Sequence, residues 1–300
     1  MSKNKEEDQY LDMMRDLLEN GDIRKTRNAT VKSLFSRELT FDLSKAFPLL
    51  TTKKMFLRGI FEELMFFING KTQTKTLEEK GVNIWKGNTC REFLDNTGLN
   101  YEEGDMGPMY GFVWRHCGAK YDGGDKDYQG KGFDQLQYVI DTLLKDPYSR
   151  RIIMTTYSPP DAKEGCLFPC HSVFTQFYVT ERNEKMYVSN LTVNRSQDVF
   201  LGNPYNIASS SLFTYLICHH LNHLSNCDKY VPDRLTMVLG DYHLYDAHYD
   251  AAKEQITRTP HPFPMLRINK FRDNIEDYKF EDIEVVDYVC DPVIKAPMVT

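Results

Sequence analysis

The sequence predicts a single α+β domain. Segments with a helical spacing of apolar residues alternate with short β-like runs, and no repeat, low-complexity segment or shift in composition marks a domain boundary. The chain has 300 residues, of which 41% are hydrophobic and 13% aromatic, so it can bury a substantial core. We therefore treat residues 1–300 as one domain.

The first half of the chain is predicted to contribute helices. Residues 6–19 carry apolar side chains at helical spacing, and residues 57–69 are apolar almost all round, which is typical of a buried helix. Glu62 and Glu63 interrupt this second helix. A buried carboxylate is costly unless it is paired. Either one glutamate faces a pocket or a partner, or both lie on a narrow solvent-exposed stripe.

The middle of the chain is predicted to be irregular before it becomes regular again. Residues 83–132 are loop-rich, a helix is expected over 133–145, and a strand over 152–156. Arg150 and Arg151 directly precede this strand. Because adjacent residues of a strand point in opposite directions, we expect one of the two arginines to do more than face solvent.

The second half is predicted to form a β-hairpin followed by helices. Strands are expected over 171–180 and 185–194, joined by a turn at 181–184. The longest apolar helix is expected over 204–223, a short strand over 235–239 and a last helix over about 246–255. The tail, residues 287–300, is expected to be extended.

Charge and cysteine content restrict the class of protein. A net charge of −6 argues against a general nucleic-acid binder, which would normally be basic. The polar N-terminus does not resemble a secretory signal, and no apolar run approaches the roughly 20 residues of a membrane span. Seven cysteines, an odd number, indicate reduced thiols. We expect a cytoplasmic protein, with the nucleus as the alternative.

Cys170 directly follows Pro169 and directly precedes a predicted strand. Proline fixes its own φ and lacks a backbone donor, so the cysteine lies at a rigid bend and its thiol points away from a sheet end. This placement suits a nucleophile. The alternative is a buried cysteine that serves as a small hydrophobic side chain.

The spacing of the cysteines, histidines and glycines argues against a metal site and against a glycine-rich phosphate loop. Cys166, Cys170 and His171 are close in sequence, and His219 and His223 are four apart, but no zinc-like pattern is present, so we expect no metal. Glycine-rich nucleotide loops are also absent, so a phosphate must be held by side chains. Arginines near Cys170 would lower the pKa of its thiol. The candidate phosphate ligands are Arg27, Arg150, Arg151, Arg195 and Ser196.

A cysteine nucleophile together with such phosphate ligands predicts an enzyme that uses covalent catalysis on a small phosphorylated molecule.

Several segments in order resemble the thymidylate synthase family. They cover nearly the whole chain and include 48–54, 62–64, 83–85, 107–111, 168–171, 194–209, 240–245 and 294–298. The resemblance implies a large mixed β-sheet flanked by helices, as in thymidylate synthases and dCMP hydroxymethylases, and a dimer formed through the sheet face. It also implies reductive methylation of dUMP to dTMP, with 5,10-methylenetetrahydrofolate as the donor of carbon and hydride.

The resemblance assigns roles to individual residues. Cys170 is the nucleophile at pyrimidine C6, Asn206 hydrogen-bonds N3–H and O4, and Glu63 organises water for proton transfer. Tyr110 acts in the proton step at C5, and Asp198 and Arg195 complete the catalytic set. The expected dUMP ligands are Arg27, Arg150, Arg151, His171, Asn194, Arg195, Ser196, Gln197, Asp198, Asn206, His243 and Tyr245. The expected folate ligands are Trp85, Asn88, Asp198, Gly202, Tyr205 and Val299.

The resemblance further implies a homodimer in which Arg150 and Arg151 reach into the partner's site. His243 and Tyr245 would contact the 3′-hydroxyl of the deoxyribose. We expect no metal, membrane or specific nucleic-acid partner. The N-terminal phosphate ligand is either Arg27 or Arg24.

The chain departs from the usual family pattern in a few places. Asn194 stands where glutamine is usual, Lys86 where aspartate is common, Ser210 where tyrosine is usual and Asp291 where histidine is common. Asn194 and Lys86 leave open a dUMP hydroxymethylase of the same superfamily. A second alternative, of another class, is a non-catalytic homologue that binds RNA or protein. A cytosine-specific enzyme would be expected to carry aspartate in place of Asn206.

Overall fold

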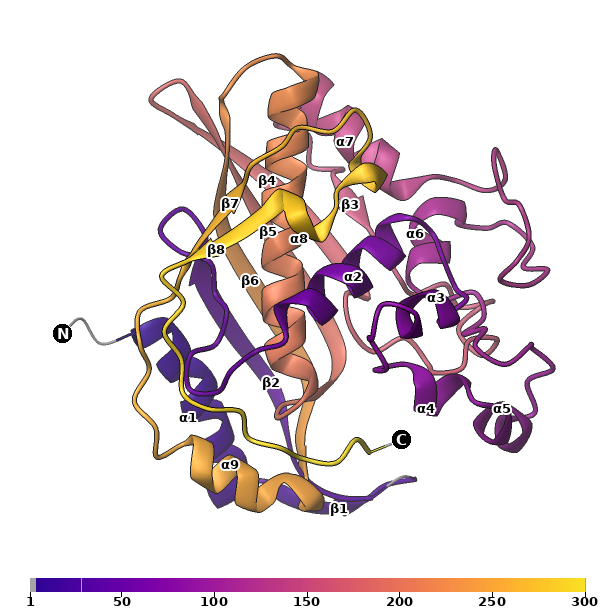
Figure 1. Cartoon of the computed structure of the whole chain (residues 1–300), viewed down its shortest axis with the longest axis vertical. Helices are drawn as coiled ribbons and strands as arrows, with labels where there is room; N and C mark the ends of the chain where they lie inside the picture. Colours follow the sequence, from indigo (N-terminus) through magenta and orange to yellow (C-terminus); the bar gives the residue numbers. More distant parts are fainter. Residues whose placement is uncertain (1–3, 28, 300) are drawn as a thin grey trace.

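The computed structural model describes residues 4–27 and 29–299, so the last residue of the predicted tail lies outside it. Its centre is a six-stranded sheet with the order β1-β2-β6-β5-β4-β3 (Figure 1). The pair β5–β6 is parallel and the other neighbours are antiparallel. The expected large mixed sheet flanked by helices is therefore confirmed. The strands are β1 Asp22–Lys25, β2 Thr30–Asp42, β3 Ile153–Met154, β4 Phe174–Arg182, β5 Lys185–Asp198 and β6 Tyr230–Tyr245.

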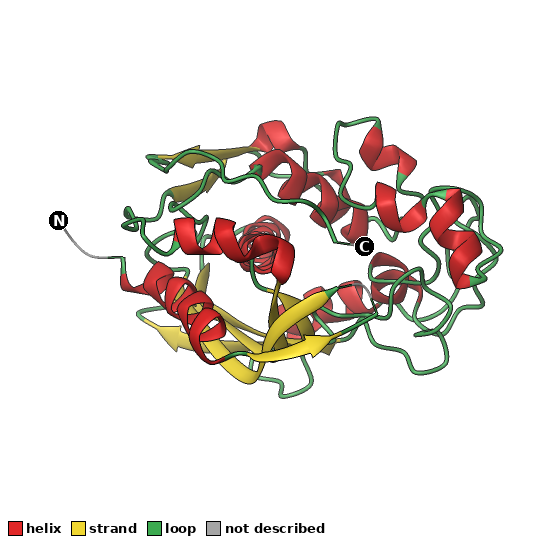
Figure 2. Cartoon of the chain, turned by 90° about the horizontal axis from the view of Figure 1, so that it is seen from below, coloured by secondary structure: helices red, strands yellow, loops and turns green. Residues whose placement is uncertain are grey.

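Helices cover one face of this sheet (Figure 2). The longest, α8 (Gly202–Leu224), lies against β5 and β6, and α1 (Lys5–Asn20) lies against β2. Between α8 and the sheet, fully buried side chains such as Leu212, Leu216 and Met237 belong to one continuous core. The other elements are α2 Leu57–Ile68, α3 Lys75–Glu78, α4 Lys86–Thr89, α5 Arg91–Thr97, α6 Gly111–His116, α7 Gln135–Lys145, η1 Asp246–His248, α9 Tyr249–Gln255, β7 Met265–Ile268, η2 Ile275–Asp277, η3 Phe280–Asp282 and β8 Ile283–Val286.

The opposite face of the sheet carries no helix (Figure 2). Paired residues of neighbouring strands share a face, and the pairs Phe174↔Val193 and Gln176↔Leu191 lie on this one. Phe174, Leu191 and Val193 are only half-buried, and Tyr178 is 67% exposed. An uncovered sheet face with apolar side chains is typical of an interaction surface.

Helices predicted at 6–19, 57–69 and 133–145 are confirmed as α1, α2 and α7, and the predicted hairpin is β4–β5. The structure differs from three expectations in extent. The loop-rich region 83–132 also contains the short helices α4, α5 and α6. The strand expected over 152–156 is reduced to β3, and the strand expected over 235–239 extends over 230–245. Gly240 does not end that strand: a Cβ there would lie 2.6 Å from the Arg195 carbonyl oxygen, so glycine permits the close approach of β5.

Strand β2 had not been predicted. Its inward positions include Ser33 as well as Val31 and Leu39, and its middle contains the exposed Phe35 and Ser36 with φ 67°. The apolar alternation that identifies a strand is therefore interrupted.

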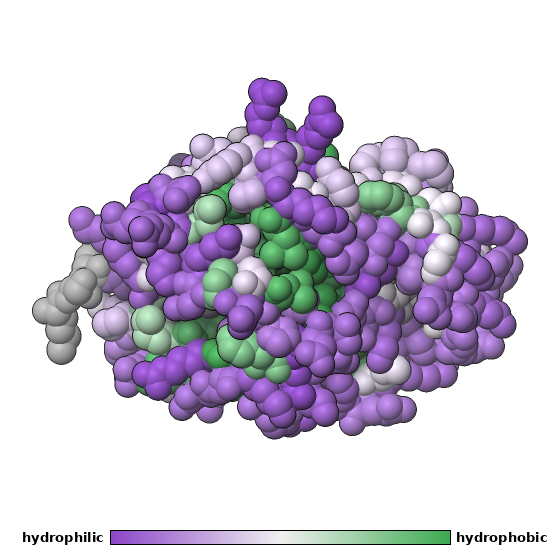
Figure 3. Space-filling view, turned by 90° about the horizontal axis from the view of Figure 1, so that it is seen from above, coloured by the Kyte–Doolittle hydropathy of each residue, from purple (hydrophilic) through white to green (hydrophobic). Residues whose placement is uncertain are grey.

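None of the helices in the described ranges is long and apolar enough to cross a membrane. On the face seen from above, hydrophilic residues predominate and hydrophobic ones gather near the middle (Figure 3).

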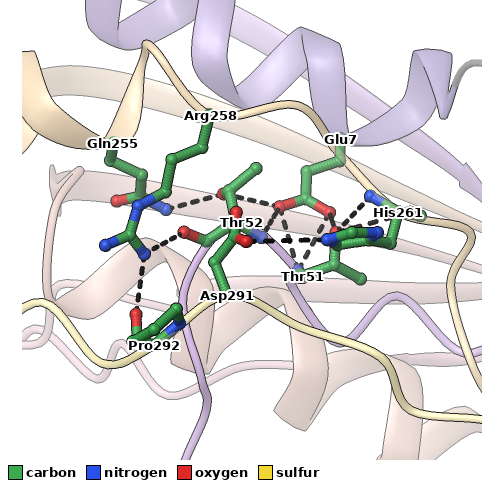
Figure 4. A network of polar contacts seen from close by, with 8 residues as sticks. All are labelled: Glu7, Thr51, Thr52, Gln255, Arg258, His261, Asp291 and Pro292. Carbon is green, nitrogen blue, oxygen red and sulfur yellow. Dashed lines mark hydrogen bonds and ion pairs between the residues drawn. The ribbon is translucent and has the colours of Figure 1, made fainter.

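Glu7 anchors α1 to the segment that leads toward α2 (Figure 4). Its carboxylate is fully buried and accepts hydrogen bonds of 2.6–3.0 Å from the backbone N–H groups and hydroxyls of Thr51 and Thr52. The Thr52 carbonyl accepts from Arg258 at 2.7 Å, and the same guanidinium nitrogen donates to the Pro292 carbonyl at 2.7 Å. The network therefore also fastens the start of the C-terminal tail.

We predict that Glu7→Gln lowers the free energy of unfolding by about 1–3 kcal/mol, because the new amide donor faces N–H groups that need an acceptor. Glu6→Gln is the matched control. One Glu6 oxygen accepts from the Asp42 N–H at 2.8 Å, and glutamine keeps that acceptor, so its effect should stay below about 0.5 kcal/mol. Urea denaturation of both variants checks this, and equal losses would contradict it.

Candidate active site

Cys170 lies beside Tyr110 at the entrance to β4. Cys170 is partly exposed as a residue, and the Tyr110 hydroxyl oxygen is 3.3 Å from Sγ. Tyr110 has φ 37°, an unfavourable conformation for a residue with a Cβ, and its ring stacks on His171 with centroids 4.3 Å apart. Gly111 allows this arrangement, because a Cβ there would lie 2.6 Å from the Phe67 carbonyl oxygen of α2. The strain at Tyr110 fits a residue placed for chemistry.

Arg195 holds the cysteine segment against β5. Its Nε donates to the Pro169 carbonyl at 2.9 Å, its backbone N–H donates to the Cys170 carbonyl at 2.8 Å, and its guanidinium lies 5.0 Å from the Phe168 ring centre. The residue itself is exposed. The guanidinium can therefore position Cys170 and still offer donors to an anion.

Arg195 lowers the pKa of the Cys170 thiol as expected, but the net shift is upward. Burial raises the pKa of Cys170, and the hydrogen bond from Tyr110 and the charge of Arg195 oppose the rise without cancelling it. Desolvation of the thiolate outweighs a single nearby guanidinium. A further positive charge would be needed to favour the thiolate.

An amide chain runs behind the cysteine segment. Asn194 accepts from the Ser172 N–H at 2.9 Å and donates to Gln197 Oε1 at 2.6 Å, and Gln197 Nε2 donates to Asn206 Oδ1 at 2.9 Å. Asn194 is fully buried and Gln197 nearly so. These two expected dUMP ligands therefore support Asn206, whose Nδ2 remains a donor and whose Oδ1 can accept a second bond.

Both glutamates of α2 are buried, so the solvent-stripe interpretation is wrong. Glu62 is 2.5 Å from Lys80 Nζ, whereas Glu63 accepts a hydrogen bond of 2.8 Å from Trp85 Nε1. Burial raises the pKa of Glu63 to about 7, and the Trp85 bond opposes that rise. A carboxyl group that changes protonation near neutral pH can transfer protons in both directions.

We predict that Glu63→Gln stabilises the protein above pH 7. The pKa of Glu63 is raised from 4.5 to about 7 in the folded chain, so the wild type loses stability as the pH rises through this window and the variant does not. At pH 8 the variant should be more stable by on the order of 1–3 kcal/mol, and the gain should vanish near pH 4.5. Thermal unfolding across this pH range checks it. A gain independent of pH would contradict it.

Tyr245, His243 and Asp198 lie near the cysteine at the ends of β5 and β6. The His243 and Tyr245 rings are 5.1 Å apart, and Asp198 pairs with His243 in the strand register. Burial raises the pKa of Tyr245 to about 12, the charges of Asp198 and Cys170 add to this, and that of Arg27 opposes it. The structure thus brings these expected site residues within electrostatic reach of one another.

The arginines differ in their surroundings. Arg24 is 3.5 Å from Asp241 and 3.6 Å from Asp22, so carboxylates already balance its charge. Arg150 and Arg151 are exposed at the start of β3, and neither guanidinium has a hydrogen bond or ion pair within residues 4–27 and 29–299.

Two of the expected folate residues, Trp85 and Tyr205, lie near Glu63. Trp85 packs against the Tyr110 ring at 5.8 Å, and burial, together with the charge of Glu63, raises the pKa of Tyr205 to about 12. Asn88 is buried, and Val299 is partly exposed in the tail, which His248 Nε2 holds at the Pro297 carbonyl, 2.8 Å away. Gly202 lies close to the amide chain, since a Cβ there would be 3.1 Å from Gln197 Nε2.

The histidines considered for a metal have other partners. His219 Nδ1 is 2.7 Å from the Tyr278 hydroxyl, and His223 Nε2 is 3.2 Å from Asp273. Across the described part of the chain, no group of three or more His, Cys, Asp and Glu residues could hold a metal ion.

A partly exposed cysteine beside a strained tyrosine, with a buried carboxyl group and an anchored arginine on a mixed sheet, is an arrangement that suits an enzyme with a cysteine nucleophile. Comparison with known proteins identifies the family. The family model described as thymidylate synthase matches residues 8–300, and the chain belongs to the thymidylate synthase family.

Full-length relatives agree with this family. The chain is 47% identical to the thymidylate synthase of Candida albicans over 99% of both chains. It is 46% identical to that of Saccharomyces cerevisiae, over 99% of this chain and 98% of the relative. The bifunctional dihydrofolate reductase-thymidylate synthase of Zea mays is also 46% identical, and the chain covers 54% of that longer protein.

Proposed function

We propose that the chain, as one catalytic domain over residues 1–300, converts dUMP to dTMP by reductive methylation. The observation that carries the proposal is the contact of Tyr110 with the thiol of Cys170, in a chain that matches the thymidylate synthase family along its length. 5,10-Methylenetetrahydrofolate supplies the carbon and the hydride and leaves as dihydrofolate.

Cys170 Sγ adds to C6 of the uracil ring, which moves negative charge onto the O4 carbonyl and activates C5. Asn206 donates from Nδ2 to O4 and accepts from N3–H at Oδ1. Gln197, which donates to the same Oδ1 at 2.9 Å, fixes this orientation. Cytosine presents the opposite pattern of donor and acceptor at these positions, so the fixed amide selects uracil.

Glu63 and Tyr110 handle the protons. Glu63, with its pKa raised to about 7, relays protons through water at O4 and C5. Tyr110, whose hydroxyl oxygen is 3.3 Å from Sγ, accepts the proton that leaves C5. C5 bonds to the methylene carbon of the folate and loses its proton, and the bond from that carbon to the folate nitrogen breaks. Hydride transfer from the tetrahydrofolate to the exocyclic carbon then expels Sγ as the thiolate, which leaves dTMP and dihydrofolate.

The phosphate is held by Arg27, Arg195 and Ser196, with His243 and Tyr245 at the sugar. Arg150 and Arg151 of a second copy complete the site in a homodimer formed through the uncovered sheet face. Their charge would also favour the Cys170 thiolate, which this chain alone does not.

The position of Arg150 and Arg151 supports the proposal that each subunit contributes them to the active site of its partner. Extending the β3–β4 register, in which Ile153 pairs with Gln176, places Arg151 level with Tyr178. That position is about 13 Å along β4 from Phe174, on the side away from Cys170. The Tyr178 side chain is 67% exposed on the helix-free face, so the unpaired arginines lie at the edge of the proposed interface.

The residues near Glu63 fit a pterin and its glutamyl extension. Trp85 and Tyr205 offer aromatic surfaces and Asp198 offers a carboxylate acceptor. His248 of η1 holds the tail that contains Val299, through the Pro297 carbonyl. We place the protein in the cytoplasm, with the nucleus as the alternative.

Dihydrofolate formation during turnover tests the proposal. The methylating enzyme oxidises its folate, so dTMP and dihydrofolate should appear in equal amounts. Turnover of dUMP without dihydrofolate would identify the hydroxymethylase instead, and nucleotide or RNA binding without turnover would indicate the non-catalytic homologue.

A further inference from the structure

His243 has a carboxylate partner at the end of β6. Its Nδ1 lies 3.0 Å from Asp241 Oδ1, and the imidazole side chain is 12% exposed. The other Asp241 oxygen accepts from the Ser33 hydroxyl at 3.1 Å and lies 3.5 Å from an Arg24 nitrogen. Asp241 is therefore surrounded by donors from β1, β2 and β6.

These donors keep Asp241 ionised. The pKa of Asp241 is lowered, first by the hydrogen bond from His243 and also by Ser33 and Arg24, against the opposing effect of burial. An ionised carboxylate can only accept hydrogen bonds, so His243 must donate from Nδ1. In the neutral imidazole, Nε2 is then an acceptor.

The acceptor at Nε2 determines what His243 can bind. A sugar hydroxyl can donate to it, whereas the opposite tautomer would present an N–H there. If Asp241 were neutral or an amide, His243 would lose the partner that selects its tautomer.

We propose that Asp241 is a positioning residue that holds His243 as a hydrogen-bond acceptor for the 3′-hydroxyl of the nucleotide. This inference rests on the proposed function, in which His243 and Tyr245 contact the deoxyribose. Asp241 itself touches neither the substrate nor the reacting atoms. It sets the preference for a nucleotide with a 3′-hydroxyl through His243.

The test compares dUMP with 2′,3′-dideoxyuridine monophosphate, which lacks the 3′-hydroxyl. In Asp241→Asn the amide can donate to Nδ1 and move the imidazole proton to Nε2. We expect KM for dUMP to rise about 10-fold with a much smaller change in kcat, and KM for the dideoxy nucleotide to stay near its wild-type value. The preference between the two nucleotides should therefore collapse. Equal changes for both nucleotides, or none, would overturn the inference.

Two further variants separate positioning from stability. Asp22→Asn alters the other carboxylate near Arg24, 3.6 Å away, and should leave the preference unchanged. Asp241→Glu keeps a carboxylate acceptor for His243 Nδ1 and should restore much of the preference for dUMP over the dideoxy nucleotide. This variant tests the inference even if Asp241→Asn fails to fold. A glutamate variant that discriminates no better than the asparagine variant would contradict the inference. If the wild type does not turn over dUMP, the proposed function fails instead.

Discussion

Cys170→Ser is expected to abolish turnover while dUMP still binds. The serine hydroxyl can keep the contact with Tyr110, so the site should retain its shape, but an alcohol is a poor nucleophile at neutral pH and a poor leaving group in the elimination. We expect kcat to fall by on the order of 10⁴-fold or more and the dissociation constant of dUMP to change by less than about 10-fold. Steady-state kinetics and calorimetry measure the two quantities.

Cys117→Ser is the control for this loss. Cys117 is partly exposed, and its backbone pairs with Phe133, away from the tyrosine–thiol contact. Its kinetics should match the wild type. Turnover retained in Cys170→Ser would refute the role of Cys170 as nucleophile. Circular dichroism checks that the variant is folded, so that lost turnover can be attributed to the missing thiol.

Arg151→Glu is expected to lose activity as a homodimer and regain it on mixing with Cys170→Ser. Replacing a phosphate-binding arginine with a carboxylate should cost about 2–5 kcal/mol of dUMP affinity. In a mixed dimer, the subunit with intact Cys170 receives the intact Arg151 of its partner. Random pairing of equal amounts should therefore restore about a quarter of the wild-type sites.

The control for subunit exchange is a mixture of Cys170→Ser with Asn206→Ala. Asn206 is bound to Gln197 within its own chain, so neither site of the mixed dimer is complete and activity should stay low. In each mixture the two variants are unfolded and refolded together. Recovered activity in the Asn206→Ala mixture, or no recovered activity in the Arg151→Glu mixture, would contradict an active site shared between subunits. Mixed dimers can be isolated with two affinity tags.

The sequence was informative where a local feature has one physical meaning. Pro169 before Cys170 indicated a thiol at a sheet end. The two glutamates in an apolar helix left a polar partner as one of two alternatives, and that partner is Trp85 for Glu63. Both conclusions follow from backbone and desolvation rules that act over a few residues.

The remaining features depend on contacts distant in sequence. The pKa of Cys170 could not be predicted because the desolvation depends on how Tyr110 and His171 close over it. Asn194, where glutamine is usual, is buried between Ser172 and Gln197 and acts through Asn206. The partnership of Asp241 with Ser33 joins residues of β6 and β2, and only the pairing of those strands brings them together.

The central claim is that Cys170 forms a covalent bond with the pyrimidine. The protein is incubated with 5-fluoro-dUMP and 5,10-methylenetetrahydrofolate, then denatured, digested and weighed by mass spectrometry. Fluorine at C5 cannot leave as a proton, so the adduct with Cys170 cannot go on to elimination. The account predicts that the peptide containing Cys170 gains the mass of the nucleotide and the folate, and that Cys170→Ser gains none. An unmodified Cys170 peptide in a protein that turns over dUMP, or an adduct on another residue, would contradict the account.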